Sequence, residues 1–243
     1  MKEIIALNPI GMGFFCARAV LACRGKPCSM ALGNGVTMKP LQFRTAAIED
    51  AGAIAQLVNE AYRPESGSRG WTHEAKLVAG NRTHADQVQA LIAKKNSVIL
   101  LGLDDQAMVA CVHIEKAGSD THIGMLAVRP NLQGTGAGKN MLAYAEDYAT
   151  RHFRAEKFVM VVVSSRKELL AFYLRRGYQQ TGIVMAYPLD AEAGVPKRAD
   201  LEIEVLHKAS DLNPDCPLEC SCMQEHRPGA NATANRGRLP SPS

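Results

Sequence analysis

A glycine-rich segment between a strand-like run and a helix-like run is the strongest constraint in this sequence. An apolar run ends at Val128, and Gly134, Gly136 and Gly138 then lead into a helical pattern. Glycine lets a backbone approach a ligand closely, and the free amides and dipole of a helix's first turn attract anions. The segment therefore predicts a strand, a turn and a helix that together bind a pyrophosphate-bearing cofactor.

Two common phosphate-binding motifs do not fit this segment. A Walker A loop needs Gly-x4-Gly-Lys-Ser/Thr, but Gln133 and Asn140 occupy its first and last positions. The dinucleotide fingerprint needs its third glycine one place after Gly138, in a βαβ unit. Nucleotide binding through either motif is therefore disfavoured.

Hydrophobic periodicity divides the middle of the chain into strands and helices. Apolar residues recur at helical spacing in four segments, 48–62, 84–95, 134–153 and 167–176. Alternating or continuous apolar runs predict seven strands, at 41–45, 97–103, 108–115, 121–128, 158–163, 178–187 and 201–206. Strands first clustered and then interleaved with helices predict an α+β fold, with a mixed central sheet of about seven strands flanked by about four helices.

Two groups of these strand segments carry further information. Short turns at 104–106 and 118–120 connect three consecutive strands, which predicts an antiparallel meander. The continuous β-branched run 158–163 is typical of a strand that is buried on both faces.

Charge and cysteine usage separate the middle of the chain from its ends. The whole chain has a net charge of +4, but residues 41–208 hold 20 basic and 19 acidic residues, a net charge of +1. A nearly neutral body argues against nucleic acid as a partner, and no apolar run reaches the length of a membrane span. Only Cys111 of the seven cysteines lies in the body, which favours a reducing compartment, the cytoplasm.

Both ends are predicted to lie outside the folded domain, which spans 38–208. Residues 1–37 are either a dispensable, disordered extension or a transit peptide that would direct the protein to an organelle. Residues 209–243 are rich in Pro, Ser, Asn, Ala and Gly, which predicts a disordered tail. The cysteines of this tail match no usual zinc spacing, so we expect no metal.

Two motifs together resemble one family. Gln133-x-x-Gly136-x-Gly138, preceded by Leu-Ala-Val-Arg-Pro, is similar to the signature loop of the GNAT superfamily of acetyl-CoA-dependent N-acetyltransferases. The segment 168–178 resembles a second element of that family, one helix and one strand further on. The resemblance covers about 41–208. The segments 65–75 and 194–201 look like a poorly characterised bacterial and fungal subgroup, which names no substrate.

The resemblance implies which residues bind acetyl-CoA. The backbone of the segment Leu126, Ala127 and Val128 would meet the pantetheine arm as an extra strand does. The pyrophosphate would be held by backbone amides of Gln133, Gly134, Thr135, Gly136, Ala137, Gly138 and Lys139. Tyr173 matches the family tyrosine that protonates the departing thiolate, a step that suits a phenol of high pKa.

Two positions depart from the family's pattern. Arg166 replaces the asparagine usual seven residues before the tyrosine, and as an arginine it is able to meet a phosphate. Gly124 stands where many relatives carry a glutamate that accepts the amine's proton. Another group must take this proton, directly or through water, and the open candidates are Glu74, His73, His113, Glu115 and His122. Spacing singles out none of them, and we carry Glu74 forward as the catalytic candidate.

The sequence thus predicts an N-acetyltransferase that moves an acetyl group from acetyl-CoA to a primary amine by direct attack, with Tyr173 as the general acid. Cys111 has no paired histidine at triad-like spacing, which disfavours a cysteine-bound intermediate. Trp71 either walls the acceptor pocket or packs its loop onto the core. The acceptor is a small-molecule or peptide amine, and a homodimer is left open. The alternative is a non-catalytic GNAT-fold module that binds acyl-CoA as a sensor or partner domain.

Overall fold

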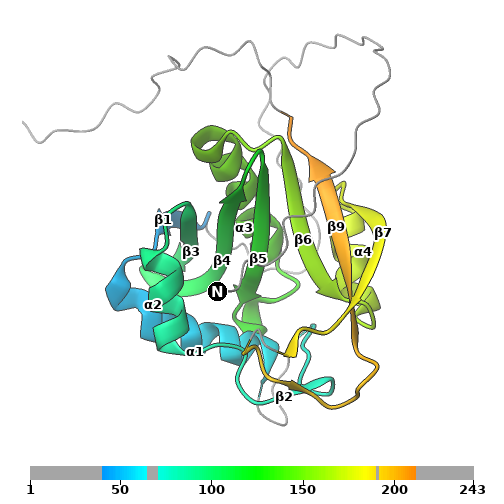
Figure 1. Ribbon diagram of the computed structural model, residues 1–243. Coiled ribbons are helices and arrows are strands. Elements are labelled where there is room, and N and C mark those ends of the chain that lie inside the picture. Colours follow the sequence, from blue (N-terminus) through cyan, green and yellow to red (C-terminus); the bar gives the residue numbers. More distant parts are fainter. Residues whose placement is uncertain (1–39, 65–70, 190–191, 212–243) are drawn as a thin grey trace, which may run out of the picture. The chain divides into compact units, whose positions relative to one another are not determined.

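A mixed sheet of seven strands organises the described part of the chain. The computed structural model describes residues 40–64, 71–189 and 192–211. Within these ranges the strands follow the order β1-β3-β4-β5-β6-β9-β7 (Figure 1). The predicted α+β class and mixed sheet are confirmed. The predicted extension 1–37 and the part of the tail at 212–243 lie outside the described residues, so both stay predictions.

The elements fall close to their predicted positions. The strands of the sheet are β1 (Gln42–Thr45), β3 (Ser97–Asp104), β4 (Ala107–Ala117), β5 (Asp120–Val128), β6 (Lys157–Val163), β7 (Gln179–Ala186) and β9 (Glu202–Ala209). The helices are α1 (Ala51–Tyr62), α2 (Ala85–Ala93), α3 (Ala137–Tyr148) and α4 (Lys167–Leu174), with 3-10 turns at Ile48–Asp50 and Pro130–Leu132 and a π-helical turn at Ala149–Phe153. None of the helices in the described ranges is long and apolar enough to cross a membrane.

Two differences from the predicted elements have local causes. The helix expected from residue 134 begins at Ala137, because Gly134 and Gly136 have φ angles of 81° and 100° and cannot continue a right-handed helix. The ribbon of β2 (Val78–Ala79) and β8 (Val195–Pro196) was not predicted. Each of its strands is too short for periodicity to reveal.

The predicted meander is present, and its last strand diverges from the next one. β3, β4 and β5 pair antiparallel. β5 and β6 are parallel, but only Asp120–His122 of β5 pairs with β6. Just beyond, β5 holds one extra residue relative to β4 at a bulge where Met125 has a φ of 51°. A bulge bends its strand, so it lies where β5 leaves β6.

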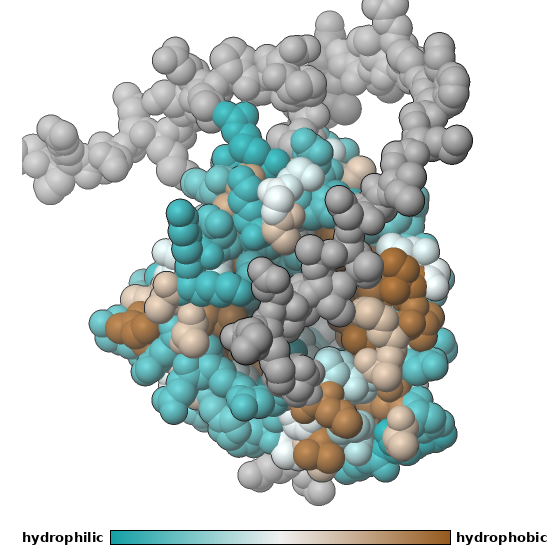
Figure 2. Space-filling model, in the orientation of Figure 1, coloured by the Kyte–Doolittle hydropathy of each residue, from teal (hydrophilic) through white to brown (hydrophobic). Residues whose placement is uncertain are grey.

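Helices cover the two faces of the sheet unequally. α3 and α4 lie on one face, while α1 and α2 lie on the other face over the β3–β5 half (Figure 1). The half formed by β6, β9 and β7 has no helix over this second face among the described residues. Val161 on β6 is therefore 48% exposed, and Figure 2 shows hydrophobic residues on this side of the molecule. The prediction that 158–163 is buried on both faces is wrong.

Neighbouring valines of β6 provide a test of this one-sided burial. Val162 is 4% exposed, and Val161 points to the opposite face. Placing a hydroxyl at a buried position costs about 1–3 kcal/mol, so Val162→Thr should lower the free energy of unfolding by that amount. Val161→Thr should change it by less than about 0.5 kcal/mol. Urea unfolding followed by circular dichroism measures both, and equal losses would mean that the second face is also covered.

Candidate functional site

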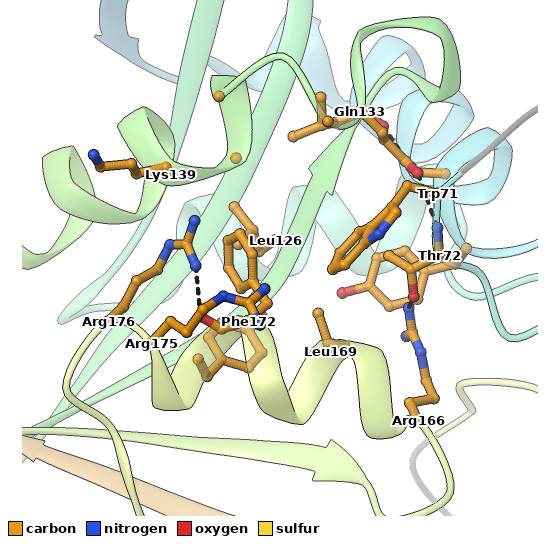
Figure 3. A pocket seen from close by; sticks show the side chains of 17 residues that line it. Trp71, Thr72, Leu126, Gln133, Lys139, Arg166, Leu169, Phe172, Arg175 and Arg176 are labelled. Carbon is orange, nitrogen blue, oxygen red and sulfur yellow. Dashed lines mark hydrogen bonds between the residues drawn. The ribbon is translucent and has the colours of Figure 1, made fainter. Parts of the chain in front are cut away.

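A cavity of about 320 Å³ lies beside the end of β5 that does not pair with β6. Its walls come from the end of α1, the end of β5, the glycine-rich loop with the start of α3, and α4 (Figure 3). The residues that line it are Ala61, Tyr62, Trp71, Thr72, Leu126, Val128, Gln133, Gly134, Gly136, Gly138, Lys139, Arg166, Leu169, Phe172, Tyr173, Arg175 and Arg176. Residues far apart in the sequence therefore share one site.

The glycine-rich loop gives the cavity an anion-binding edge. Gly134 and Gly136 have positive φ angles, and a Cβ atom at either position would meet nothing within 4 Å. The backbone is thus open to a ligand along this loop. α3 begins directly after Gly136, and the amides of a helix's first turn lack partners within the helix. Together these features match a site for phosphate groups.

Positive charge gathers at the same end of the cavity. In Figure 3 the side chains of Lys139, Arg175 and Arg176 lie near one another beside the start of α3. Desolvation and the charge of neighbouring Arg175 lower the pKa of Arg176, and its buried Nε has no hydrogen-bond partner among the described residues. None of the described lining residues is an aspartate or a glutamate. This end is therefore suited to a multiply charged anion.

Tyr173 supplies a buried phenol to the cavity. It projects from α4, is 7% exposed, and packs edge-on against Phe172, with ring centroids 5.1 Å apart. Burial raises the pKa of Tyr173 well above its ordinary value, and neighbouring Tyr62 raises it further. The phenol is therefore protonated at neutral pH and is able to donate a proton.

Trp71 and Thr72 close the opposite end of the cavity. The Thr72 backbone N–H donates to Gln133 Oε1 at 3.1 Å, and its hydroxyl contacts both Glu168 and Arg166 at 2.8 Å. These contacts fix Trp71, whose ring centroid lies 5.9 Å from that of Phe172. Trp71 lines this cavity, and its predicted role as a wall of the acceptor pocket stays a prediction.

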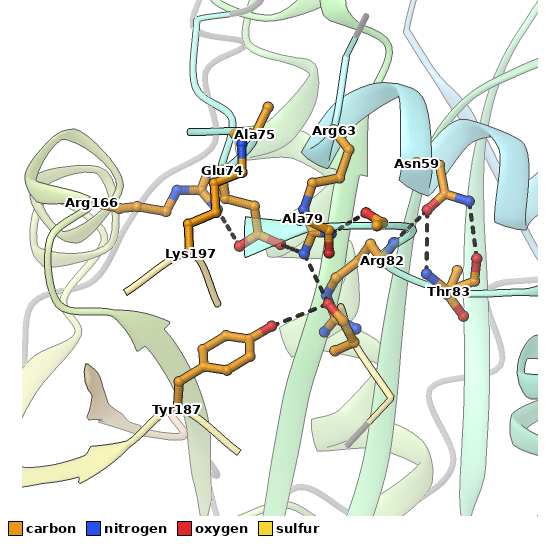
Figure 4. A network of polar contacts seen from close by, with 12 residues as sticks. Asn59, Arg63, Glu74, Ala75, Ala79, Arg82, Thr83, Arg166, Tyr187 and Lys197 are labelled. Carbon is orange, nitrogen blue, oxygen red and sulfur yellow. Dashed lines mark hydrogen bonds and ion pairs between the residues drawn. The ribbon is translucent and has the colours of Figure 1, made fainter. Parts of the chain in front are cut away.

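Glu74 lies in a buried ion-pair cluster instead of lining the cavity (Figure 4). Its Oε1 is 2.6 Å from Arg63 and its Oε2 is 3.8 Å from Arg166. Arg63 also donates to the carbonyl groups of Gly80 and Ala193. Both carboxylate oxygens thus face guanidinium groups, and the cluster joins α1, the β2–β8 ribbon and the start of α4. A proton acceptor is expected to line the cavity, and Glu74 does not.

The other candidate proton acceptors also lie outside the lining. Burial lowers the pKa of His113 to about 4, and its ring is hydrogen-bonded to Ser97 at 2.9 Å. Glu115 is ion-paired with a lysine, and His122 is exposed on β5. His73 has a buried Nδ1 without a hydrogen-bond partner among the described residues.

Neither a reactive cysteine nor a metal cluster is apparent in the described ranges. Cys111 is fully buried, and this burial raises its pKa to about 12, so it is a thiol and not a nucleophilic thiolate. No group of three or more His, Cys, Asp or Glu residues within those ranges is placed to hold a metal ion.

Most of the residues singled out in the sequence converge on the cavity. Those that line it are Leu126, Val128, Gln133, Gly134, Gly136, Gly138, Lys139, Arg166 and Tyr173. Ala127 and Ala137 are instead buried in the core, and the Thr135 hydroxyl donates to the Leu132 carbonyl. Sequence reasoning did not assign Ala61, Tyr62, Thr72, Leu169, Phe172, Arg175 or Arg176 to the site. Leu169 lies four residues before Tyr173, on the same face of α4, so helical spacing would have identified it.

The chain matches the model of a known protein family. Residues 54–178 match the model of the acetyltransferase (GNAT) family. The chain belongs to the GNAT family. An S-alkylcysteine N-acetyltransferase of Bacillus subtilis is 27% identical to this GNAT chain in a 149-position alignment that covers 56% of this chain and 78% of that protein. The prediction of a GNAT N-acetyltransferase is confirmed.

Solved structures share the fold of this GNAT protein. A ribosomal-protein-alanine N-acetyltransferase from Escherichia coli superimposes with a TM-score of 0.54 at 12% identity, covering 71% of this chain and 95% of that one. A spermidine N-acetyltransferase SpeG chimera from Vibrio cholerae and hSSAT gives 0.52 at 13%, covering 71% and 96%. At this identity the likeness shows the fold alone.

The cavity of this GNAT protein fits acetyl-CoA, the acetyl donor of the family. The loop around Gly134 and Gly136 is open to a pyrophosphate. Lys139, Arg175 and Arg176 offer positive charge for further phosphate groups, and the buried Nε of Arg176 has no hydrogen-bond partner among the described residues. Apolar side chains such as Leu126 lie between this end and Trp71 (Figure 3).

Substitution of Glu74 distinguishes a structural role from a catalytic one. Glu74→Gln removes the charge that compensates Arg63 and Arg166, and breaking a buried ion pair costs about 3–5 kcal/mol. We expect urea unfolding to show that loss. The control Asp200→Asn breaks an exposed pair with Arg198 and should leave the unfolding midpoint unchanged. Unchanged stability with lost activity in Glu74→Gln would instead indicate a catalytic group.

Gly136→Ala tests the anion-binding loop. A side chain in this left-handed conformation costs about 1–2 kcal/mol, so the loop should shift and CoA binding should weaken at least several-fold by calorimetry. The control Gly52→Ala lies within α1 with nothing near its Cβ. It should leave CoA binding unchanged and stabilise the protein by about 1 kcal/mol. Unaltered CoA binding in Gly136→Ala would exclude this loop as the contact.

Proposed function

We propose that this GNAT protein transfers an acetyl group from acetyl-CoA to a primary amine by direct attack, with Tyr173 as the general acid. The observation that carries the proposal is that Tyr173, a buried phenol with a raised pKa, lines the same cavity as the glycine-rich loop. A proton donor and an anion site are thus brought together from segments that are distant in the sequence.

Different residues of the chain bind different parts of acetyl-CoA. Loop amides between Gln133 and Lys139 hold the pyrophosphate, and the unpaired edge of β5 near Leu126 and Val128 meets the pantetheine arm. Arg166 lines the cavity in place of the family's asparagine, and its Nε is buried without a hydrogen-bond partner among the described residues. That N–H is therefore a donor for a bound ligand.

Proton transfer involves Tyr173 and the solvent. Acetyl-CoA supplies the acetyl group and a thiolate leaving group, and Tyr173 donates its proton to that sulfur as the bond to carbon breaks. Since none of the described lining residues carries a carboxylate, the amine loses its own proton to water. Glu74 acts as a positioning residue that holds Arg166 at the cavity.

The acceptor class and the compartment rest on separate observations. The similar proteins are named for three kinds of amine, an S-alkylcysteine, a ribosomal protein alanine and spermidine, which supports a primary amine without choosing among them. Cys111 is buried and unpaired, which supports the cytoplasm as the compartment.

Tyr173→Phe tests the general acid and separates catalysis from the sensor alternative. Removing a positioned proton donor should lower kcat by about 10²–10⁴-fold, measured as release of free thiol from acetyl-CoA with an amine panel. CoA binding should be retained. Because burial raises the pKa of Tyr173, the phenol stays protonated as pH rises, so wild-type kcat should show no fall between pH 7 and 9.5.

Tyr62→Phe is the matched control, because Tyr62 lines the same cavity and also has a pKa raised by burial. This variant should keep most of the activity. A larger loss of kcat in Tyr62→Phe than in Tyr173→Phe would indicate that Tyr62 is the general acid. Tight CoA binding by the wild type, with no thiol release for any amine, would favour the sensor.

A further inference from the structure

One arginine next to the cavity wall stands outside the ion-pair cluster of Glu74. Arg63 and Arg166 are ion-paired with Glu74, and Arg166 also lies 3.9 Å from Glu168. Arg82 pairs with no carboxylate of the described ranges. Its guanidinium carbon instead lies 5.5 Å from the ring centroid of Tyr62, which lines the cavity.

The backbone at Arg82 is held rigidly by α1. The Arg82 N–H donates to Asn59 Oδ1 at 2.7 Å, and the same oxygen accepts from the Thr83 N–H. Asn59 Nδ2 in turn donates to the Thr83 carbonyl at 3.0 Å. The side chain of Arg82 takes no part in these contacts, so a change of that side chain leaves them intact.

The Arg82 guanidinium packs against Tyr62, which lines the cavity, but Arg82 itself is not among the lining residues. Arg166 lies at the end of the cavity opposite the phosphate-binding loop in Figure 3, and its guanidinium carbon lies 5.8 Å from the same Tyr62 ring. Figure 4 shows Arg82 and Tyr187 pointing toward each other. The charge of Arg82 also lowers the pKa of Tyr62, Tyr187 and His113, although burial is the largest influence on each group and shifts the two tyrosines the other way.

This charge distribution discriminates between classes of acceptor. A guanidinium presents a planar fork of N–H donors that matches a carboxylate. A polyamine would place a further cation beside Arg63, Arg82 and Arg166, against only Glu74 and Glu168, and like charges at short range repel. A carboxylate would instead give Arg82 the counter-charge that it lacks.

We propose that the acceptor is an amine that also carries a carboxylate, as an amino acid does, and that Arg82 binds this carboxylate. The inference rests on the proposed acetyl transfer and narrows its substrate class. Arg82 is then a specificity-determining residue that orients the amine toward the acetyl group, while Tyr173 keeps its role at the sulfur.

The test compares each amino acid with its own carboxamide. The full-length wild type, Arg82→Met and Arg82→Lys are assayed by thiol release with S-methylcysteine, phenylalanine and alanine, each beside its carboxamide, and with spermidine. For an accepted amino acid, Arg82→Met should lower kcat/KM by about 10- to 100-fold, the value of a charge-assisted hydrogen bond. For the carboxamide it should change less than about 2-fold, and Arg82→Lys should recover part of the loss.

Two controls separate recognition from folding. Arg82→Met should bind CoA as tightly as the wild type by calorimetry, because the contacts of its backbone are unchanged. Arg151→Met removes an exposed arginine that is paired with Asp147 and should alter neither acceptor class.

Two results would overturn the inference while leaving acetyl transfer intact. One is a wild type that acetylates spermidine or carboxamides and rejects the amino acids. The other is an equal loss in Arg82→Met for both members of a pair. If no amine releases thiol, the proposed function fails, and calorimetry of the same amino acids with the CoA-bound protein still tests Arg82. Binding that is lost in Arg82→Met supports the inference, and binding that is absent or unchanged overturns it.

Discussion

The early end of the β5–β6 pairing is the constraint on which the rest of the site depends. Only Asp120–His122 of β5 pairs with β6, and the bulge at Met125 then bends β5. The remaining edge of β5 keeps backbone groups that no neighbouring strand uses. The cavity lies against this edge, and α4 supplies Tyr173 to it. A continuous β5–β6 ladder would leave no place for either a cofactor or a buried phenol.

Polar contacts between distant segments then fix the two ends of the cavity. Gln133 bridges the Thr72 N–H and the Val128 carbonyl, so the glycine-rich loop, β5 and the Trp71 segment are held together. The buried Glu74 does the same for Arg63 and Arg166. Lys139, Arg175 and Arg176 carry positive charge at one end of the cavity, and Arg82 packs against Tyr62 outside its lining. The proposed ligand pair, CoA with an amino acid, is anionic at both extremes.

Local sequence patterns correctly predicted the features of the fold that depend on local interactions. The meander, the four helices and the loop at Gly134–Gly138 follow from periodicity and glycine placement. The exposed face of β6 could not be predicted in this way, because an apolar run does not indicate which neighbouring elements cover it. The contacts of Glu74 and Thr72 with Arg166 could not be predicted either, since each joins residues more than 90 positions apart. Leu169 could have been predicted, because it lies one helical turn before Tyr173 on the same face of α4.

The lack of a carboxylate among the described lining residues has a chemical consequence for the acceptor. An ammonium group that enters a cavity surrounded by guanidinium groups is disfavoured relative to the free amine, because like charges lower its pKa. In a free amino acid the carboxylate stabilises the ammonium group of the same molecule. If that carboxylate pairs with Arg82, the ammonium loses this stabilisation. The ammonium would then lose its proton to water because of the surrounding positive charge. The amine would become a nucleophile although Gly124 replaces the glutamate that serves as the base in many relatives.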